Sequence, residues 1–222
     1  MNNKFKNAFT LAEVLITLVV IGVVAALTVR VLFSTTDTQE RVARVKKTYS
    51  MFSQAMTHVK ARGGDMDMEV FDNDNVAMKN WFDQYLKPRL NTMSVCYDTS
   101  GCWNKSGTYG MNGALVPYNR AGGIGANTIS VILADGTFLL MDAFNASDMQ
   151  NKLGIDSKGR SGIIAYFDIN GPKRPNKMGS DVFAMVYVTG KGMTVPYKDK
   201  EPDDCNPNGV GYSCIKQWLK QF

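Results

Sequence analysis

One group of candidate oxygen ligands in the sequence lies between residues 168 and 181. Asp168, Asn170 and Asp181 can bring carboxylate and amide oxygens together if this segment folds back as a loop, and calcium prefers such oxygens. The EF-hand pattern is absent, and two lysines and an arginine share the segment. A calcium site and a rigid turn, in which these side chains accept hydrogen bonds from backbone N–H groups, are both open. The basic residues favour the turn.

Other residue types that could do chemistry lack the partners that a catalytic site needs. His58 is the only histidine, whereas a zinc enzyme normally has more than one and a serine triad needs an activated serine. A G-x-S-x-G turn is absent from the sequence. The glycines of residues 122–125 come without the lysine of a phosphate-binding loop. We therefore expect a protein that is not an enzyme and has no cofactor, calcium being the one candidate.

Seven basic residues, with tyrosines among them, flank the apolar runs of the C-terminal third. The formal net charge of the chain is +5, which is too small to predict nucleic-acid binding by itself. Cations interleaved with aromatic rings do bind single strands in some proteins, so DNA binding is one interpretation, and an ordinary solvated surface is the favoured one. The basic residues are Arg160, Lys173, Arg174, Lys177, Lys191, Lys198 and Lys200, and the tyrosines are Tyr166, Tyr187 and Tyr197.

Four cysteines lie in two local groups, Cys96 with Cys102 and Cys205 with Cys214. Neither spacing is the C-x-x-C of a zinc ribbon or a redox motif. Four cysteines allow three disulfide connectivities, and the local one closes the shortest loops. An even number of cysteines after an apolar segment indicates an oxidising compartment, with four reduced thiols as the alternative.

A single charge, Glu13, interrupts the apolar run of residues 9–29. This run is long enough to cross about 30 Å of hydrocarbon at 1.5 Å per residue, and Lys4 and Lys6 before it predict a cytoplasmic N-terminus. It is longer than the core of a cleaved secretory signal. A carboxylate in such a helix is costly unless it is paired or reaches the headgroups.

The stretch Ala8-Phe9-Thr10-Leu11-Ala12-Glu13 resembles the prepilin peptidase site of type IV pilins and type II secretion pseudopilins. In that family a short basic leader is cut before an aromatic residue, the new terminus is N-methylated and the fifth mature residue is glutamate. The resemblance implies cleavage between Ala8 and Phe9, methylation of Phe9, and pairing of Glu13 with the amine of a neighbouring subunit. Two departures are Ala8 in place of the usual glycine and Arg30 where major pilins often have proline.

The resemblance also implies an organisation for the whole chain. It divides the chain into a leader (1–8), a transmembrane half-helix (9–30) and an extracytoplasmic globular domain (31–222) of a single-pass protein in the bacterial inner membrane. Its partners would be prepilin peptidase and other pilin or pseudopilin subunits. Major pseudopilins of this family carry a calcium site in a loop between strands, which parallels the oxygen-rich loop described above.

The favoured function is therefore a structural subunit of a type IV pilus or type II secretion filament, and the long loops and two cysteine pairs favour a minor one. One alternative is a module at the filament tip that binds DNA or a surface ligand through loops 91–127 and 171–200. Another is a single-pass membrane enzyme, for which the sequence offers no catalytic set.

The elements that must position these residues follow from hydrophobic periodicity. Apolar residues recur every three or four positions from Val42 to Val59, without proline, before Gly63-Gly64, so one helix is predicted from about residue 10 to about 62. A break near residues 34–37 is the alternative. A shorter helix is expected over 78–90.

Strands are expected after these helices. Asp135-Gly136 between two apolar runs predicts a hairpin, and a further strand is expected around 114–118. The whole is an α+β, pilin-like fold, with the long N-terminal helix packed on an antiparallel sheet and loop-rich insertions. The predicted apolar runs are 128–134, 137–141, 163–168 and 182–188.

Overall fold

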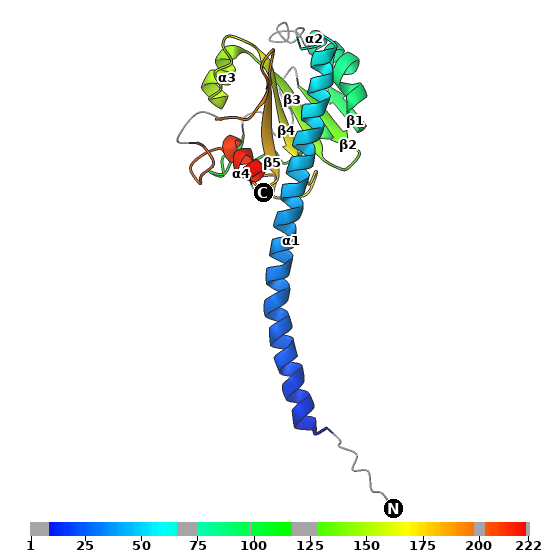
Figure 1. Cartoon of the computed structure of the whole chain (residues 1–222), viewed down its shortest axis with the longest axis vertical. Helices are drawn as coiled ribbons and strands as arrows, with labels where there is room; N and C mark the ends of the chain where they lie inside the picture. The colour runs from blue at the N-terminus through cyan, green and yellow to red at the C-terminus, as the bar shows by residue number, and fades with distance from the viewer. Residues whose placement is uncertain (1–8, 66–74, 98, 117–127, 198–202, 221–222) are drawn as a thin grey trace, which may run out of the picture. The chain divides into compact units, whose positions relative to one another are not determined.

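The computed structural model divides the chain into two compact units, residues 1–41 and 42–222 (Figure 1). The residues that the structure describes are 9–65, 75–97, 99–116, 128–197 and 203–220.

Helix α1 (Leu11–Ala61) begins in the first unit and continues without a break into the second. The predicted single long helix is confirmed, and the alternative break near residues 34–37 is wrong. Neither proline nor glycine occurs between Gly22 and Gly63, so nothing in the sequence interrupts the i→i−4 hydrogen bonds of the helix.

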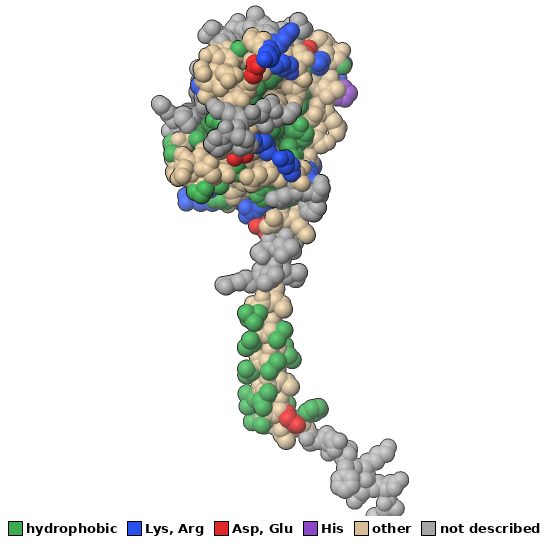
Figure 2. Space-filling view, turned by 60° about the vertical axis from the view of Figure 1, so that its left-hand side comes forward, with side chains coloured by type: hydrophobic (Ala, Val, Ile, Leu, Met, Phe, Trp, Pro, Cys, Tyr) green, Lys and Arg blue, Asp and Glu red, His purple; other side chains and the backbone are tan. Residues whose placement is uncertain are grey.

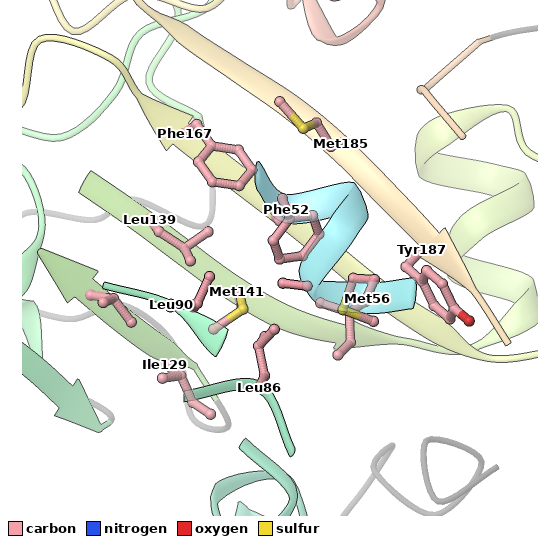
Figure 3. Close-up of a cluster of buried hydrophobic side chains, with 14 of the residues drawn as sticks. Phe52, Met56, Leu86, Leu90, Ile129, Leu139, Met141, Phe167, Met185 and Tyr187 are labelled. Carbon is pink, nitrogen blue, oxygen red and sulfur yellow. The ribbon is translucent and has the colours of Figure 1, made fainter. Parts of the chain in front are cut away.

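In the second unit, α1 lays its predicted apolar stripe on a β-sheet. Phe52, Met56 and Val59 are completely buried, and the side chains of Val42 and Val45 are at most 3% exposed. Figure 3 shows Phe52 and Met56 pointing from one turn of α1 into a cluster of side chains from the strands behind it. The stripe therefore forms one half of the main hydrophobic core.

The sheet has six strands, and each pairs antiparallel with the next strand in the chain. Each strand can follow the one before it without a crossover, because short connections join antiparallel neighbours. In chain order the strands are β1 (Thr92–Tyr97), β2 (Ile129–Leu133), β3 (Phe138–Phe144), β4 (Gly162–Asp168), β5 (Val182–Val188) and β6 (Gly192–Thr194).

The four central strands match the predicted apolar runs, whereas the edges of the sheet were not predicted. β1 lies within residues 91–127, which were expected to be mostly loop because they are rich in Gly, Asn and Ser. No side chain of β1 is fully buried. β6 is only three residues long. The prediction of a strand around residues 114–118 is wrong for residues 114–116, the part that the structure describes. There Leu115 makes only an isolated bridge to Tyr109.

The predicted Asp-Gly hairpin joins β2 to β3. Leu133 and Thr137 close the turn through a hydrogen bond from Leu133 N to Thr137 O at 2.9 Å, and Asp135 Oδ1 accepts from Thr137 N at 3.1 Å. Gly136 has φ of +82°, a left-handed conformation that a side chain would strain. Asp135 also pairs with Lys47 of α1 at 2.7 Å, so the turn is held against the helix.

Both faces of the sheet are covered, and every residue of β4 and β5 is buried. The face away from α1 packs against α3 (Ala146–Leu153) through Met149 and Leu153, and against the loops that follow β1. The sequence did not predict α3, although Asn145 caps its start and Gly154 ends it in a left-handed conformation.

The helix expected over 78–90 is present with a changing pitch. It begins as α2 (Asn75–Trp81), widens into a π-helical turn η2 (Phe82–Leu86) and tightens into a 3₁₀ turn η3 (Lys87–Arg89). Pro88 lies in the last turn, where it ends the helix as predicted. The remaining helical segments are η4 (Ser100–Cys102), η5 (Tyr212–Cys214) and α4 (Ile215–Lys220).

We predict that Phe52→Ala lowers the free energy of unfolding by about 3–5 kcal/mol, because it empties a fully buried site. The ring of Phe52 is wholly inaccessible and packs edge-on against Phe167, with ring centroids 5.3 Å apart. Guanidinium titration of the full chain in detergent, followed by tryptophan fluorescence, measures the loss. Thr57→Ala, on the exposed side of α1, is the control and should change stability by less than about 0.5 kcal/mol. Equal losses would contradict the packing described.

Candidate functional site

Thr10 and Glu13 form a reciprocal cap at the start of α1. Glu13 N donates to Thr10 Oγ1 at 3.2 Å, and Glu13 Oε2 accepts from both the backbone N–H and the hydroxyl of Thr10 at 2.9 Å. This is a capping box, which satisfies N–H groups that would otherwise lack partners at a helix start. Sequence analysis did not identify Thr10, although the Thr-x-x-Glu spacing is the signal for it.

The helix that follows this cap exposes an apolar surface on all sides. Every described side chain from Leu11 to Thr28 is exposed, and Figure 2 shows hydrophobic side chains along the face of this part of α1 that is turned to the viewer. By length and composition the segment is able to cross a membrane, a test that a signal sequence near the N-terminus also passes. Soluble monomers rarely leave so large an apolar surface in water, so this surface is suited to burial in a membrane or against a partner.

The predicted cleavage site lies just before the capped helix. Phe9 and Thr10 have no regular secondary structure, and Phe9 is 86% exposed. Ala8, with the rest of the predicted leader, lies outside the described residues. A peptide bond before Phe9 therefore precedes the first helical residue, and cleaving it does not require α1 to unwind.

Asp168, one of the three residues predicted to hold calcium, is fully buried at the end of β4. Its carboxylate accepts hydrogen bonds from Asn170 N at 3.1 Å and from the side-chain amide of Asn104. Burial raises the pKa of Asp168 to about 7; the bond from Asn104 opposes this shift and the charge of Asp181 adds to it. Sequence analysis missed Asn104, which lies 64 residues from its partner and carries no local signal.

Asp181 is equally buried and accepts hydrogen bonds from three donors. These are Asn176 N at 2.8 Å, Lys177 N at 2.6 Å and Asn170 Nδ2 at 3.1 Å. Asp168, Asn170 and Asp181 therefore do come together, in the geometry of a rigid turn whose carboxylates bind N–H groups. In this turn the amide nitrogen of Asn170 donates to Asp181, and the Oδ1 atom of Asn170 is buried without a hydrogen-bond partner among the described residues.

Calcium binding stays a prediction of the sequence, and comparing thermal unfolding in calcium and in a chelator tests it. Among the residues that the structure describes, no group of three or more His, Cys, Asp or Glu side chains lies close enough to hold a metal ion.

The cysteines form the local pairs, Cys96 with Cys102 and Cys205 with Cys214. The first disulfide closes the loop that follows β1. The second closes the C-terminal loop, for which the chain-entropy model gives a stabilisation of about 2–3 kcal/mol.

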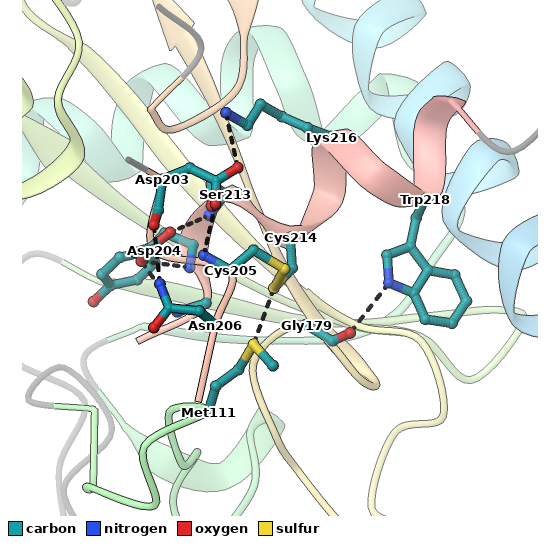
Figure 4. Close-up of a disulfide and its surroundings, with 12 residues drawn as sticks. Met111, Gly179, Asp203, Asp204, Cys205, Asn206, Ser213, Cys214, Lys216 and Trp218 are labelled. Carbon is teal, nitrogen blue, oxygen red and sulfur yellow. Dashed lines mark hydrogen bonds and ion pairs between the residues drawn. A yellow bond between two sulfur atoms is a disulfide. The ribbon is translucent and has the colours of Figure 1, made fainter. Parts of the chain in front are cut away.

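The C-terminal loop is also fastened by hydrogen bonds (Figure 4). Both carboxylate oxygens of Asp204 accept from the consecutive backbone N–H groups of residues 211–213, at 2.7–3.0 Å. Trp218 Nε1 donates to Gly179 O at 3.1 Å, which ties the tail to the loop between β4 and β5. The loops at this end of the sheet therefore form one connected structure.

The remaining candidate residues do not gather into a site. His58 is exposed on α1 and lines an open groove with Lys47 and Arg89. The glycines at 122–125 lie outside the described residues.

The predicted basic surface is divided in two. Two of the seven cations flank one end of the β4–β5 pair and three lie in the loop at its other end, roughly 20 Å away along a seven-residue strand. Tyr166 and Tyr187 are buried, so neither ring is free to stack on a base. One end holds Arg160 and Lys191, and the other end holds Lys173, Arg174 and Lys177. Lys198 and Lys200 lie outside the described residues.

Comparison with known proteins identifies the N-terminal segment. Residues 3–29 match the prokaryotic N-terminal methylation motif, the signature of type IV pilins and pseudopilins. This motif implies processing by prepilin peptidase and assembly with other pilin subunits, and its family is structural rather than enzymatic. No curated protein and no solved structure matches the chain significantly.

We predict that the free energy of unfolding falls as the pH rises from about 5 to about 7, and that Asp168→Asn removes this fall. The carboxyl of Asp168 has a folded-state pKa near 7 and an ordinary value of 3.8. Between these values the folded chain binds more protons than the unfolded chain, so stability decreases with pH. Denaturant titrations at pH 5, 6, 7 and 8 measure the slope. An unchanged slope in Asp168→Asn would contradict the assignment.

Proposed function

We propose that this chain is a minor structural subunit of a bacterial type IV pilus or type II secretion filament. The observation that carries the proposal is the coincidence, within residues 3–29, of the methylation motif and a helix whose apolar side chains are exposed all round. A membrane covers that surface in the precursor, and the helices of other subunits cover it in a filament.

Glu13 changes partners in this proposal. In the precursor, the backbone N–H and hydroxyl of Thr10 satisfy its carboxylate within the same helix. Cleavage before Phe9 creates a positively charged amine, and packing of helices brings the amine of one subunit to Glu13 of the next. An opposite charge within a few Å in a low dielectric offsets much of the cost of removing both charges from water, so the pair sets the register of assembly.

The proposal places residues 1–8 in the cytoplasm as a leader, 9–30 in the inner membrane and 31–222 on the extracytoplasmic side. Lys4 and Lys6 support this orientation. The two disulfides support it independently, because disulfides persist in oxidising compartments. The minor role is supported by the elaborate loops fastened around one end of the sheet.

We expect the mature chain to begin at Phe9 with one added methyl group. Intact-mass and N-terminal analysis of the protein, recovered from membranes of cells with and without prepilin peptidase, measures this. Without the peptidase the chain should keep its leader. A chain cut after Ala26, or left uncut in the presence of the peptidase, would contradict the proposal.

We predict that Glu13→Gln is cleaved normally but fails to enter filaments. Glutamine at this third position of the helix still completes a capping box, so the variant removes the charge and keeps the cap. Thr10→Val is the matched control, because it removes the hydroxyl of the cap and keeps the carboxylate. Filament yield, measured in sheared fractions against total subunit, should fall at least tenfold only in Glu13→Gln. Normal assembly of Glu13→Gln would show that ion pairing is not what Glu13 supplies.

A binding role at the filament tip is the second candidate function. What favours it is a cavity between residues 101–106 and 172–176, inside the two loop regions that the sequence singled out for binding. The division of the described cations between opposite ends of the sheet does not favour DNA as the ligand.

A further inference from the structure

An open groove runs along α1 in the second compact unit. Its first hollow, of about 560 Å³, lies between one side of α1 and the residues Pro88 and Arg89. A second hollow, of about 390 Å³, lies between α1 and the turn that follows β2. Lys47 and Met51 line both hollows, so the two adjoin. Both volumes are within the range of ligand sites.

The lining of the groove combines apolar side chains with basic ones. Met51 and Pro88 supply apolar surface to the first hollow, and Met51 also lines the second. Lys47, His58 and Arg89 are all exposed to solvent and line the first hollow. Apolar surface bordered by cations suits a peptide that carries both apolar and acidic side chains, because contact and charge are then satisfied together.

The charges beside the groove leave an excess of positive charge. The described residues that line the first hollow include no acidic side chain. In the second hollow Asp135 pairs with Lys47 at 2.7 Å, but the two side chains are 36% and 65% exposed, and such a pair is weak. Beside Arg89, Lys87 pairs with Asp83 at 2.8 Å, and their charges offset one another. Lys47 and Arg89 therefore favour an anionic partner.

The sequence of this chain contains a segment of matching chemistry, residues 66–74. The segment carries four acidic residues, Asp67, Glu69, Asp72 and Asp74, and no Lys, Arg or His. Between the acidic residues it carries four apolar ones, Met66, Met68, Val70 and Phe71. The segment lies outside the described residues, so the match is one of charge and apolar composition.

Residues 66–74 of the same chain are too short to line the whole groove. They connect the end of α1 to α2, and α2 lies beside that end because Trp81 Nε1 donates to Gly64 O at 2.6 Å. Lys47 is 14 residues before Ala61, the last residue of α1, which is about 21 Å along a helix. Reaching Lys47 and returning requires about 40 Å, whereas nine extended residues span about 32 Å. A second copy has no such constraint.

We propose that this groove binds residues 66–74 of a neighbouring copy of the chain, with its acidic side chains beside Lys47 and Arg89 and its apolar ones against Met51 and Pro88. The groove and the segment are different surfaces, so each copy binds one neighbour and is bound by another. Such a heterologous contact extends into an open filament when its rotation does not close a ring. The proposal rests on the proposed filament function for its setting, but the contact itself needs only two chains.

The test titrates a fluorescent peptide, with the sequence of residues 66–74, with the full chain in a non-ionic detergent. Detergent alone is the blank, and fluorescence anisotropy measures binding. We expect saturable binding with a Kd on the order of 0.1 mM or tighter. Binding should weaken several-fold between about 0.05 and 0.5 M NaCl, because salt screens exposed charges. A peptide with Asn or Gln in place of the four acidic residues should not bind.

Two variants with matched controls separate the charge of the groove from its shape. Arg89→Glu should weaken binding about tenfold, because it replaces attraction by repulsion. Arg174→Glu, an exposed cation in the loop between β4 and β5, should leave binding unchanged. Ser50→Trp fills the first hollow without changing its charge and should abolish binding. Thr57→Trp, on the exposed side of α1 and outside the lining, is its control.

Absence of peptide binding would overturn the proposal. So would equal losses in Arg89→Glu and Arg174→Glu, unchanged binding in Ser50→Trp, or equal binding of the peptide without acidic residues. A chain that binds the peptide as expected but never enters filaments would contradict the proposed function and leave the contact in place. The two failures are therefore distinguishable.

Discussion

The burial of one stripe of α1 against the sheet is the contact on which the globular unit depends. Phe52, Met56 and Val59 lose all contact with water there. The same helix exposes apolar side chains on every side between Leu11 and Thr28. A single helix therefore presents two surfaces with different requirements: a narrow stripe satisfied within the chain, and a complete apolar cylinder that only a bilayer or other helices can satisfy.

The opposite face of the sheet is organised by polar contacts as well as apolar ones. Loops cover it, and buried loops must satisfy their backbone groups. Asp181 does this for the turn before β5 and Asp204 for the C-terminal loop, each by accepting several backbone N–H bonds.

Glu13 illustrates how a costly group is kept in an apolar segment. Its carboxylate has a local partner in Thr10 while the subunit is alone. An amine from a neighbour is a stronger partner in a low dielectric than a neutral hydroxyl. In the proposed assembly, exchange of one for the other would give the membrane-embedded precursor and the assembled subunit each a satisfied state.

Sequence alone determined the features whose signals are local. The periodicity of α1, the four central strands and the Asp135-Gly136 turn depend on residues near one another in the chain, as does the N-terminal motif. The local disulfide pairing was only favoured by the sequence, which left three connectivities open, and the structure decided it. Tertiary structure alone decided the edge strand β1, the contact of Asn104 with Asp168 across 64 residues, the division of the cations and the cavity beside Trp103. These depend on which distant segments the folded sheet brings together, and periodicity and turn chemistry contain no information about that.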